Sequence, residues 1–453
     1  MLAFAAYLGF GRGKFRFPDL SAPQRMAIVV GACATLVASV IVRASIDASI
    51  VASQHPGVPA SELRYAVMFD GVRTDASASN LALVLSFVQS LGLGCLVWGL
   101  NDGKRGAVRI AVVVCSMAAM FVISACETTL KSADLIAYAG FATLGQAAYH
   151  PPNVPFAHSF GAINRFWGLP MIPCPYGPAW LALARVATVN AHSLAAKIDA
   201  LRALSGVALL ACTLLLMLGR RERDRFAIVA AFALNPALYE QFVVDGHNDI
   251  IGIALVLAAM VLIRLPYVAT LLVAAAVCVK LPFILVGAVV FSDIPNLRRR
   301  VVLAGTAMLL GVVVTFVLVG PTYASAMLSE ATRRQFPNLA TGFVHAACLA
   351  ASFAAVVWGV ARRRFGPGGV LPFAGIGVLP FPWYVVWSVP YALRAGYLLV
   401  LLVALPALSG LFSSAYEDTR FRQAVDIATF FVAFVVAAIL YRRSRQRLSA
   451  LVA

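Results

Sequence analysis

The stretch VVLAGTAMLLGVVVTFVLVG at residues 301–320 carries no charged side chain and no proline. Its length matches the roughly 20 residues that an α-helix needs to cross the hydrocarbon core of a bilayer. Comparable apolar runs recur along the chain, at about 27–44, 81–100, 108–126, 198–218, 226–243, 249–264, 267–293, 342–361, 369–382, 384–395, 396–412 and 425–441. The runs are continuous rather than alternating, which favours helices over the strands of a membrane barrel.

The composition of the whole chain agrees with these runs. Of its 453 residues, 61% are hydrophobic and 12% are charged, and the mean hydropathy is +0.88. A soluble protein has about a quarter of its residues charged, so this chain cannot cover a water-exposed surface. We therefore predict an all-α, polytopic integral membrane protein of about 13 or 14 transmembrane helices. A soluble enzyme, a disulfide scaffold and a disordered protein are excluded.

The distribution of the basic residues indicates the membrane topology of the chain. The net charge is +17, from 36 Lys and Arg against 19 Asp and Glu. Most of the basic residues lie in short clusters between apolar runs, for example at 104–109, 220–225, 298–300, 362–364 and 442–447. Such clusters mark the cytoplasmic ends of spans, so we predict that both termini lie in the cytoplasm. No basic face with interleaved aromatic residues is present, which argues against a nucleic-acid partner.

This topology places three long segments outside, at 45–80, 127–197 and 321–341. Segment 127–197 is rich in proline, and we expect a short helix over 135–148, with Ser132 or Asp134 as its N-cap, and an amphipathic helix over 179–191. Cys126 and Cys174 both fall on this side and could pair in an oxidising compartment. No cleavable signal peptide is evident, so the first span is expected to insert uncleaved.

Three parts of the chain are predicted from these runs and segments. Residues 1–107 form an N-terminal tail and two spans with an outer loop. Residues 108–300 form a second part that includes the large outer segment 127–197, and residues 301–453 form the C-terminal spans. In the run 267–293, the interruption Lys280-Leu281-Pro282 predicts two half-length helices in place of one span.

Carboxylates are scarce, and several fall at the outer ends of spans. Glu127, Asp134, Asp245 and Asp249 are so placed, and charged groups at a membrane edge are functional candidates. For Asp134 the structural alternative is an N-cap that binds the first amides of a helix.

A second polar group lies between two apolar spans, in Asn235-Pro236, Glu240 and Asp245-Gly-His-Asn-Asp249. His247 and Asp249 could share a metal ion, although two ligands do not make a site. The structural alternative is a turn in which Asn248 or Asp249 caps the next helix.

Cations and aromatic residues form a third group. Lys280 lies within an apolar run and needs water, a carboxylate or a phosphate as its partner. Arg165, Arg333 and Arg334 lie in outer segments, where they could bind an anionic headgroup or be solvated. Trp383 and Tyr384, with Trp387, are compatible with an interfacial aromatic belt or with a platform for a sugar ring or prenyl chain.

The order of these motifs resembles a known superfamily. The series Ser132-Ala-Asp134-Leu-Ile-Ala-Tyr138, Tyr149-His-Pro151-Pro152, Trp167 and Pro175-Tyr176-Gly177-Pro178 is similar to the first large outer loop of GT-C membrane glycosyltransferases. The later Asn235-Pro236, Gly246-His247-Asn248-Asp249, Lys280-Leu-Pro282 and Pro382-Trp383-Tyr384 fit the same pattern. The nearest pattern is that of the polyprenyl-phosphate-mannose-dependent α-mannopyranosyltransferases of bacterial envelopes, and the likeness spans about 108–395.

This resemblance implies an inverting glycosyltransferase at the outer face of the cytoplasmic membrane. The donor would be a polyprenyl-phosphate sugar and the acceptor an envelope glycan or glycolipid, with membrane lipids around both. Asp134 matches the loop carboxylate that acts as the base, and a divalent metal is compatible with the site. The stretch Gln146-Ala-Ala-Tyr149-His-Pro-Pro departs from the family pattern, which leaves the sugar open between mannose and another hexose or pentose. The substrate-binding candidates are Tyr138, Arg165, Tyr176, Glu240, His247, Asn248, Asp249, Lys280, Arg333, Arg334, Trp383 and Tyr384.

The chemistry of such a transfer fits these residue types. A lipid phosphate is a stable leaving group, so a strong general acid is not needed, and one carboxylate suffices to deprotonate the attacking hydroxyl. Two alternatives remain from the sequence. A secondary transporter or flippase of lipid-linked sugars would also have broken helices and membrane-edge charges, although two similar halves are not evident. A non-catalytic assembly subunit would not need Asp134.

Overall fold

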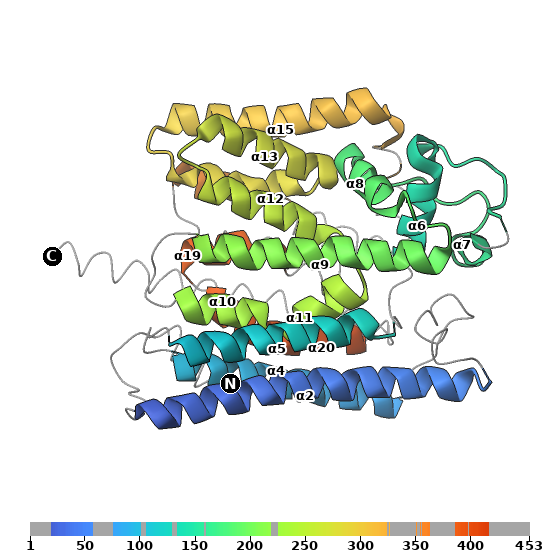
Figure 1. Ribbon diagram of the computed structural model, residues 1–453. Coiled ribbons are helices and arrows are strands. Elements are labelled where there is room, and N and C mark those ends of the chain that lie inside the picture. Colours follow the sequence, from blue (N-terminus) through green and yellow to red (C-terminus); the bar gives the residue numbers. More distant parts are fainter. Residues whose placement is uncertain are drawn as a thin grey trace.

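A computed structural model describes residues 20–57, 76–100, 106–128, 134–157, 160–218, 225–323, 326, 350, 354, 356–362, 386–396 and 398–415. Within these residues the regular elements are all helices, and no strand occurs. The long helices run alongside one another, and the short helices α6, α7 and α8 gather at one end of the stack (Figure 1). The prediction of an all-α, polytopic membrane protein is confirmed.

The first three long helices form one side of the molecule. They are α2 (Ala22–Gln54), α4 (Ala76–Leu100) and α5 (Ala107–Cys126). Ser21 opens α2 with a capping box, because its hydroxyl accepts from the backbone of Gln24 while the Gln24 side chain accepts from the backbone of Ser21. Helix α2 packs against both α4 and α5.

The segment between α5 and the next long helix folds into short elements. These are α6 (Asp134–Leu144), the 3₁₀ turn η2 (Gly145–Tyr149), α7 (Gly161–Trp167) and α8 (Pro178–Thr188). Helix α6 contacts α7, α8 and α9. The predicted helix over 135–148 is therefore present as α6 and η2, with Asp134 as the first helical residue rather than its N-cap. The predicted helix over 179–191 corresponds to α8.

The central helices carry a break that the sequence did not predict. Helix α9 (Leu194–Leu218) is followed by α10 (Arg225–Ala233), α11 (Pro236–Tyr239), the π-helix η4 (Glu240–Val244) and α12 (Asp249–Val261). We expected one span over 226–243, but the chain bends by 47° between α10 and α11. Pro236 cannot donate a backbone hydrogen bond. Beside it, the side-chain Nδ2 of Asn235 donates to the carbonyl oxygen of Leu402 at 2.8 Å.

The predicted interruption at residues 280–282 is confirmed. Helix α13 (Pro266–Val279) ends immediately before Lys280, and α14 (Phe283–Gly287) continues into the 3₁₀ turn η5 (Ala288–Asp293). Helix α15 (Leu297–Val319) packs on α13, and α12 packs on the opposite side of α13. Later in the chain, α19 (Val389–Ala395) and α20 (Leu398–Ala415) return to the core, where α20 packs against α4 and α10.

In the described part of the chain, five helices are long and apolar enough to cross a membrane. They are Ala22–Gln54, Asn80–Leu100, Ala107–Cys126, Leu194–Leu218 and Leu297–Val319, and the bent pair from Arg225 to Val244 would make a sixth. Four shorter apolar helices accompany them: Asp249–Val261, Pro266–Val279, Phe283–Asp293 and Leu398–Gly410. Large apolar side chains are exposed on the long helices, for example Val317 at 76%, as expected for surfaces that face lipid. The count of 13 or 14 stays a prediction, since the runs at 369–382 and 425–441 lie outside the described residues.

Two local expectations are corrected. Cys126 and Cys174 are both free thiols, the first exposed and the second buried, so they do not form a disulfide. Helix α2 continues to Gln54, so residues 45–54 are helical rather than part of an outer loop. Within this extension the hydroxyls of Ser45 and Ser49 each donate to a carbonyl oxygen four residues earlier on the same helix.

Candidate functional site

Residues 240–249 form the centre of the candidate site. The π-helix η4 ends in a turn at Asp245-Gly246-His247-Asn248, and α12 begins at Asp249. Gly246 has a φ of +63°, and a Cβ added there would lie 2.4 Å from the side chain of Leu135 on α6. Glycine is therefore required here by both backbone conformation and space. π-helices often occur at functional sites.

Helix α9 holds this segment from the other side. Nε of Arg202 donates to the carbonyl oxygen of Val244 at 2.8 Å, and the hydroxyl of Ser205 donates to the carbonyl oxygen of Gly246 at 3.1 Å. Both side chains are buried. The backbone of the turn is thus bound by side chains from a long membrane helix, which restricts where His247 can lie.

Asp134 lies against His247. The Nδ1 atom of His247 is 3.4 Å from Oδ2 of Asp134, at the start of α6. The His247 side chain has no exposed surface, whereas the Asp134 side chain is 24% exposed. The carboxylate therefore contacts a buried imidazole and is itself partly exposed.

Asp249 contacts a second set of partners. Nζ of Lys280 lies 2.9 Å from Oδ1 of Asp249, and Nε1 of Trp387 donates to the same oxygen at 2.8 Å. The ammonium also lies 5.4 Å from the ring centre of Tyr176 and 5.5 Å from that of Trp387, within cation–π distance. Asp249 is therefore a carboxylate partner for Lys280, whose ammonium lies within an apolar run.

Tyr176 reaches Lys280 because its loop approaches α13 very closely. The backbone N–H of Gly177 donates to the carbonyl oxygen of Val279 at 3.0 Å, and a Cβ on Gly177 would lie 2.1 Å from the carbonyl oxygen of Cys278. The carbonyl of Tyr176 accepts from the hydroxyl of Tyr149 at 3.1 Å. Glycine at 177 therefore allows the outer segment to dock beside the helix break.

Aromatic rings join this loop to α6 and α8. The rings of Tyr138, Tyr176 and Trp180 pack together, with centroids 5.2 Å apart between Tyr138 and Tyr176 and 4.9 Å apart between Tyr138 and Trp180. Tyr138 and Trp180 are each only 1% exposed. Tyr138, predicted to bind substrate, thus supports the wall of the site in this arrangement.

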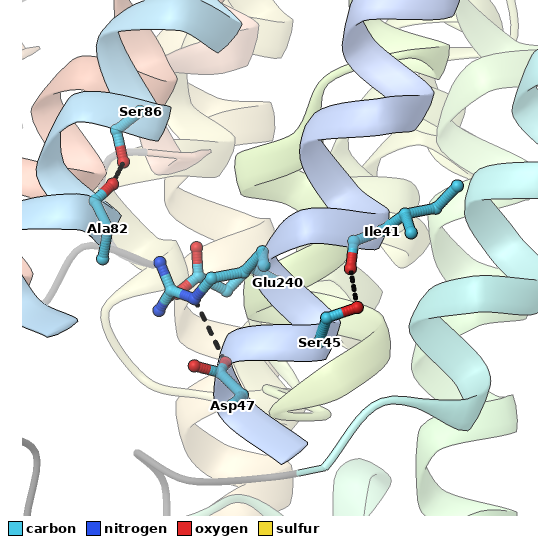
Figure 2. A network of polar contacts seen from close by, with 7 residues as sticks. Ile41, Ser45, Asp47, Ala82, Ser86 and Glu240 are labelled. Carbon is cyan, nitrogen blue, oxygen red and sulfur yellow. Dashed lines mark hydrogen bonds and ion pairs between the residues drawn. The ribbon is translucent and has the colours of Figure 1, made fainter. Parts of the chain in front are cut away.

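A third cluster connects Glu240 to the first membrane helix. Nη2 of Arg43 on α2 lies 3.2 Å from Oε1 of Glu240, and Nε of Arg43 lies 3.1 Å from Oδ2 of Asp47, one turn further along α2. In Figure 2 Asp47 and Glu240 lie in the same region but come from different elements. The pKa of Glu127, which follows α5, is raised well above its usual range, first by burial and then by the charge of Asp47, while Arg43 opposes the shift.

The remaining candidates fall into three groups. Arg165 lies exposed on α7. Arg333, Arg334, Trp383 and Tyr384 lie outside the described residues. Asn248 occupies the N-cap position of α12, but its side chain makes no capping hydrogen bond, and both of its polar atoms are buried without a partner.

His247 and Asp249 contact different groups, namely Asp134 and Lys280. No group of three or more His, Cys, Asp or Glu that could hold a metal ion occurs among the residues that the structure describes.

Sequence reasoning did not find three of these residues. The apolar run 27–44 ends before Asp47, so the sequence predicts Asp47 in a loop and does not reveal its pairing with Arg43. Their spacing of four residues on one helix face was the signal available. Trp180 was read only as part of an amphipathic helix, and its position beside Tyr138 depends on the packing of α6 against α8.

Comparison with known protein families matches residues 28–294 to the alpha-(1->6)-mannopyranosyltransferase N-terminal domain. The match covers more than half of the chain. The chain belongs to this family. No curated protein and no solved structure matches it.

Membership of the mannopyranosyltransferase family makes the chain a glycosyltransferase, which takes a sugar donor and a glycan acceptor. The GT-C resemblance read from the sequence is confirmed at the level of the family. The matched range begins within α2 and ends after η5, so it contains Arg43, Asp134, Glu240, His247 and Lys280.

Proposed function

We propose that the protein transfers mannose from a polyprenyl-phosphate donor to an envelope glycan or glycolipid, with inversion at the anomeric carbon. The observation that carries this proposal is the placement of Asp134, a partly exposed carboxylate that is backed by the fully buried His247 at 3.4 Å. An attacking hydroxyl needs a positioned base, and a base of this kind contributes roughly 10²–10⁴-fold to the rate.

In the proposed step, the oxygen of an acceptor hydroxyl attacks the anomeric carbon of the donor sugar. The bond from that carbon to the phosphate oxygen breaks, and its electron pair leaves with the lipid phosphate. The hydroxyl proton passes to the carboxylate of Asp134. A single displacement of this kind inverts the configuration, and it needs one carboxylate, because the phosphate leaves without protonation.

Within this proposal His247 supports the base. Its side chain has no exposed surface, so we place it behind Asp134 rather than on the donor phosphate. The distance of 3.4 Å is longer than an ordinary hydrogen bond, and such contacts commonly tighten when substrate binds.

The donor phosphate needs cations. Lys280 is engaged by Asp249, so we assign the phosphate to Arg165 on α7 and to the pair Arg333 and Arg334, with a divalent metal as a further candidate. Guanidinium groups bind phosphate oxygens through paired hydrogen bonds. Trp383 and Tyr384 are proposed to contact the sugar or the prenyl chain.

The name of the family supports a proposal for the acceptor position. We propose that the attacking group is the primary 6-hydroxyl of a mannose residue, so that the product is α-(1→6)-linked. Tyr176, which is partly exposed, is proposed to contact the acceptor. Helices α6, α7 and α8 gather at one end of the long helices (Figure 1). We propose that this end faces the extracytoplasmic side of the cytoplasmic membrane, with both termini on the other side.

The test is direct transfer by the purified protein. It is incubated in lipid vesicles with radiolabelled polyprenyl-phosphate mannose and an α-mannan acceptor, beside donors that carry other hexoses or pentoses. We expect labelled mannose in the acceptor with a 1→6 linkage by methylation analysis. Movement of the lipid-linked sugar across the vesicle without transfer would instead establish a transporter or flippase.

The sidedness has a test of its own. A reporter fused after Ala148 is expected to register outside the cytoplasm, because segment 127–197 follows a span whose basic residues are predicted to lie inside. A cytoplasmic signal at this position would contradict the placement of the site.

A further inference from the structure

Arg43 occupies an unusual place for an arginine. It lies within α2, an apolar helix long enough to cross a membrane, and its side chain is 10% exposed. A buried guanidinium is costly unless its charge and its donors are matched. Two carboxylates match it: Asp47 on its own helix at 3.1 Å and Glu240 on η4 at 3.2 Å. The contact with Glu240 joins residues 197 positions apart in the chain.

Other carboxyl groups accompany this pair. Glu127, after α5, and Asp245, after η4, are buried. The charges of Asp47, Glu240 and Asp245 raise the pKa of Glu127, whereas the charge of Arg43 lowers it. Removal of Arg43 would leave Glu240 with the like charge of Asp47 beside it and favour the displacement of Glu240.

Glu240 is connected to the candidate base through the backbone. Its carbonyl oxygen accepts from the N–H of Asp245 at 3.0 Å, and the carbonyl oxygen of Gln241 accepts from the N–H of His247 at 3.1 Å. These bonds close the π-helix and start the turn that brings His247 to Asp134. A shift of Glu240 therefore moves the backbone that carries His247.

We infer that Arg43 is a positioning residue: its ion pair with Glu240 holds the π-helix in the register that places His247 against Asp134. Helix α2 then helps to position the site through Arg43 and is more than a lipid-facing anchor. This inference rests on the proposed function for its kinetic consequence, but the positional claim concerns the protein alone.

Activity variants test the kinetic consequence. Arg43→Gln and Glu240→Gln are each expected to lower kcat for mannose transfer about 100-fold, the scale of a misplacement of about 1 Å at a reacting group, with KM for the donor little changed. The double variant is expected to lose no more than either single variant, because both remove the same contact. Arg43→Lys, which restores the charge, is expected to recover part of the rate. Arg25→Gln is the matched control on the same helix, since Arg25 donates to backbone oxygens of Leu20 and Trp98.

A structural readout separates this inference from the proposed function. Hydrogen–deuterium exchange at the amides of 241–248 is expected to accelerate in Arg43→Gln and to stay at the wild-type rate in Arg25→Gln. If the wild-type protein transfers no mannose but this exchange pattern holds, the proposed function fails and the positioning role stands. If exchange at 241–248 is unchanged, or if the two losses in kcat multiply in the double variant, the positioning role is wrong. A fall in melting temperature of Arg43→Gln with kcat per folded molecule unchanged would also overturn it.

Discussion

The Nζ atom of Lys280 lies 2.9 Å from Oδ1 of Asp249, and both side chains are almost completely buried. The two residues come from the break after α13 and from the first turn of α12. A buried ion pair adds little when both partners can be replaced together, but removal of one partner leaves a charge without compensation. This pair therefore determines how the broken helix and the start of α12 are held together.

Lys280→Met is expected to destabilise the protein by about 3–5 kcal/mol, because Asp249 then keeps a buried negative charge whose main cation is lost. The double variant Lys280→Met/Asp249→Asn is expected to regain much of that loss. Thermal unfolding in detergent, followed by intrinsic fluorescence, measures both. If the double variant is as unstable as the sum of the two single variants, the pair is not the reason for the loss.

Gly177→Ala is expected to destabilise the docking of segment 127–197 by about 1–3 kcal/mol. The added Cβ would meet the carbonyl oxygen of Cys278 at 2.1 Å, and backbone cannot move aside as a flexible side chain can. Gly161→Ala is the control, since a Cβ at Gly161 meets nothing within 4 Å. Equal melting temperatures for the two variants would show that the close approach of Gly177 to α13 does not matter.

Much of this arrangement could be predicted from the sequence. The parts that could not be predicted have physical reasons. The break at Lys280-Leu281-Pro282 was predictable because proline and a charge interrupt an apolar run. The bend at Asn235-Pro236 carried the same proline signal, but the run around it remained apolar enough to suggest one span. Asp134 was predictable as a candidate because it begins an outer helix. Its contact with His247, like that between Arg43 and Glu240, depends on packing between distant helices and leaves no mark in local sequence.

The stability of the protein is expected to depend on pH through Glu127. Burial and then neighbouring carboxylates raise the pKa of the Glu127 carboxyl in the folded state. In the unfolded chain the pKa of a Glu side chain is about 4.3, so the folded state binds this proton more tightly. The contribution of this proton to the free energy of unfolding is fully present below pH ~4.3 and is lost as the pH rises through the folded-state pKa of Glu127.

Glu127→Gln carries no titrating proton and is expected to flatten the decline of melting temperature with rising pH. Melting curves of the wild type and the variant across this window measure the difference. An identical slope in the two proteins would show that Glu127 is not the group responsible.

His247→Ala is expected to reduce kcat more than it raises KM, because the imidazole contacts Asp134 and has no exposed surface for substrate. His247→Asn, whose amide can donate a hydrogen bond to Asp134, is expected to recover part of kcat. Steady-state kinetics with varied donor separate the two parameters. A rise in the KM for the donor with kcat unchanged would place His247 on the substrate instead.

The central claim, that Asp134 is the base, is tested most directly by mannose transfer with Asp134→Asn. The amide keeps the size of the side chain and cannot accept the proton, so we predict a loss of about 10²–10⁴-fold in kcat with wild-type folding. Thr143→Ala, an exposed change on the same helix α6, is expected to keep the wild-type rate. Transfer by Asp134→Asn at the wild-type rate would contradict the account.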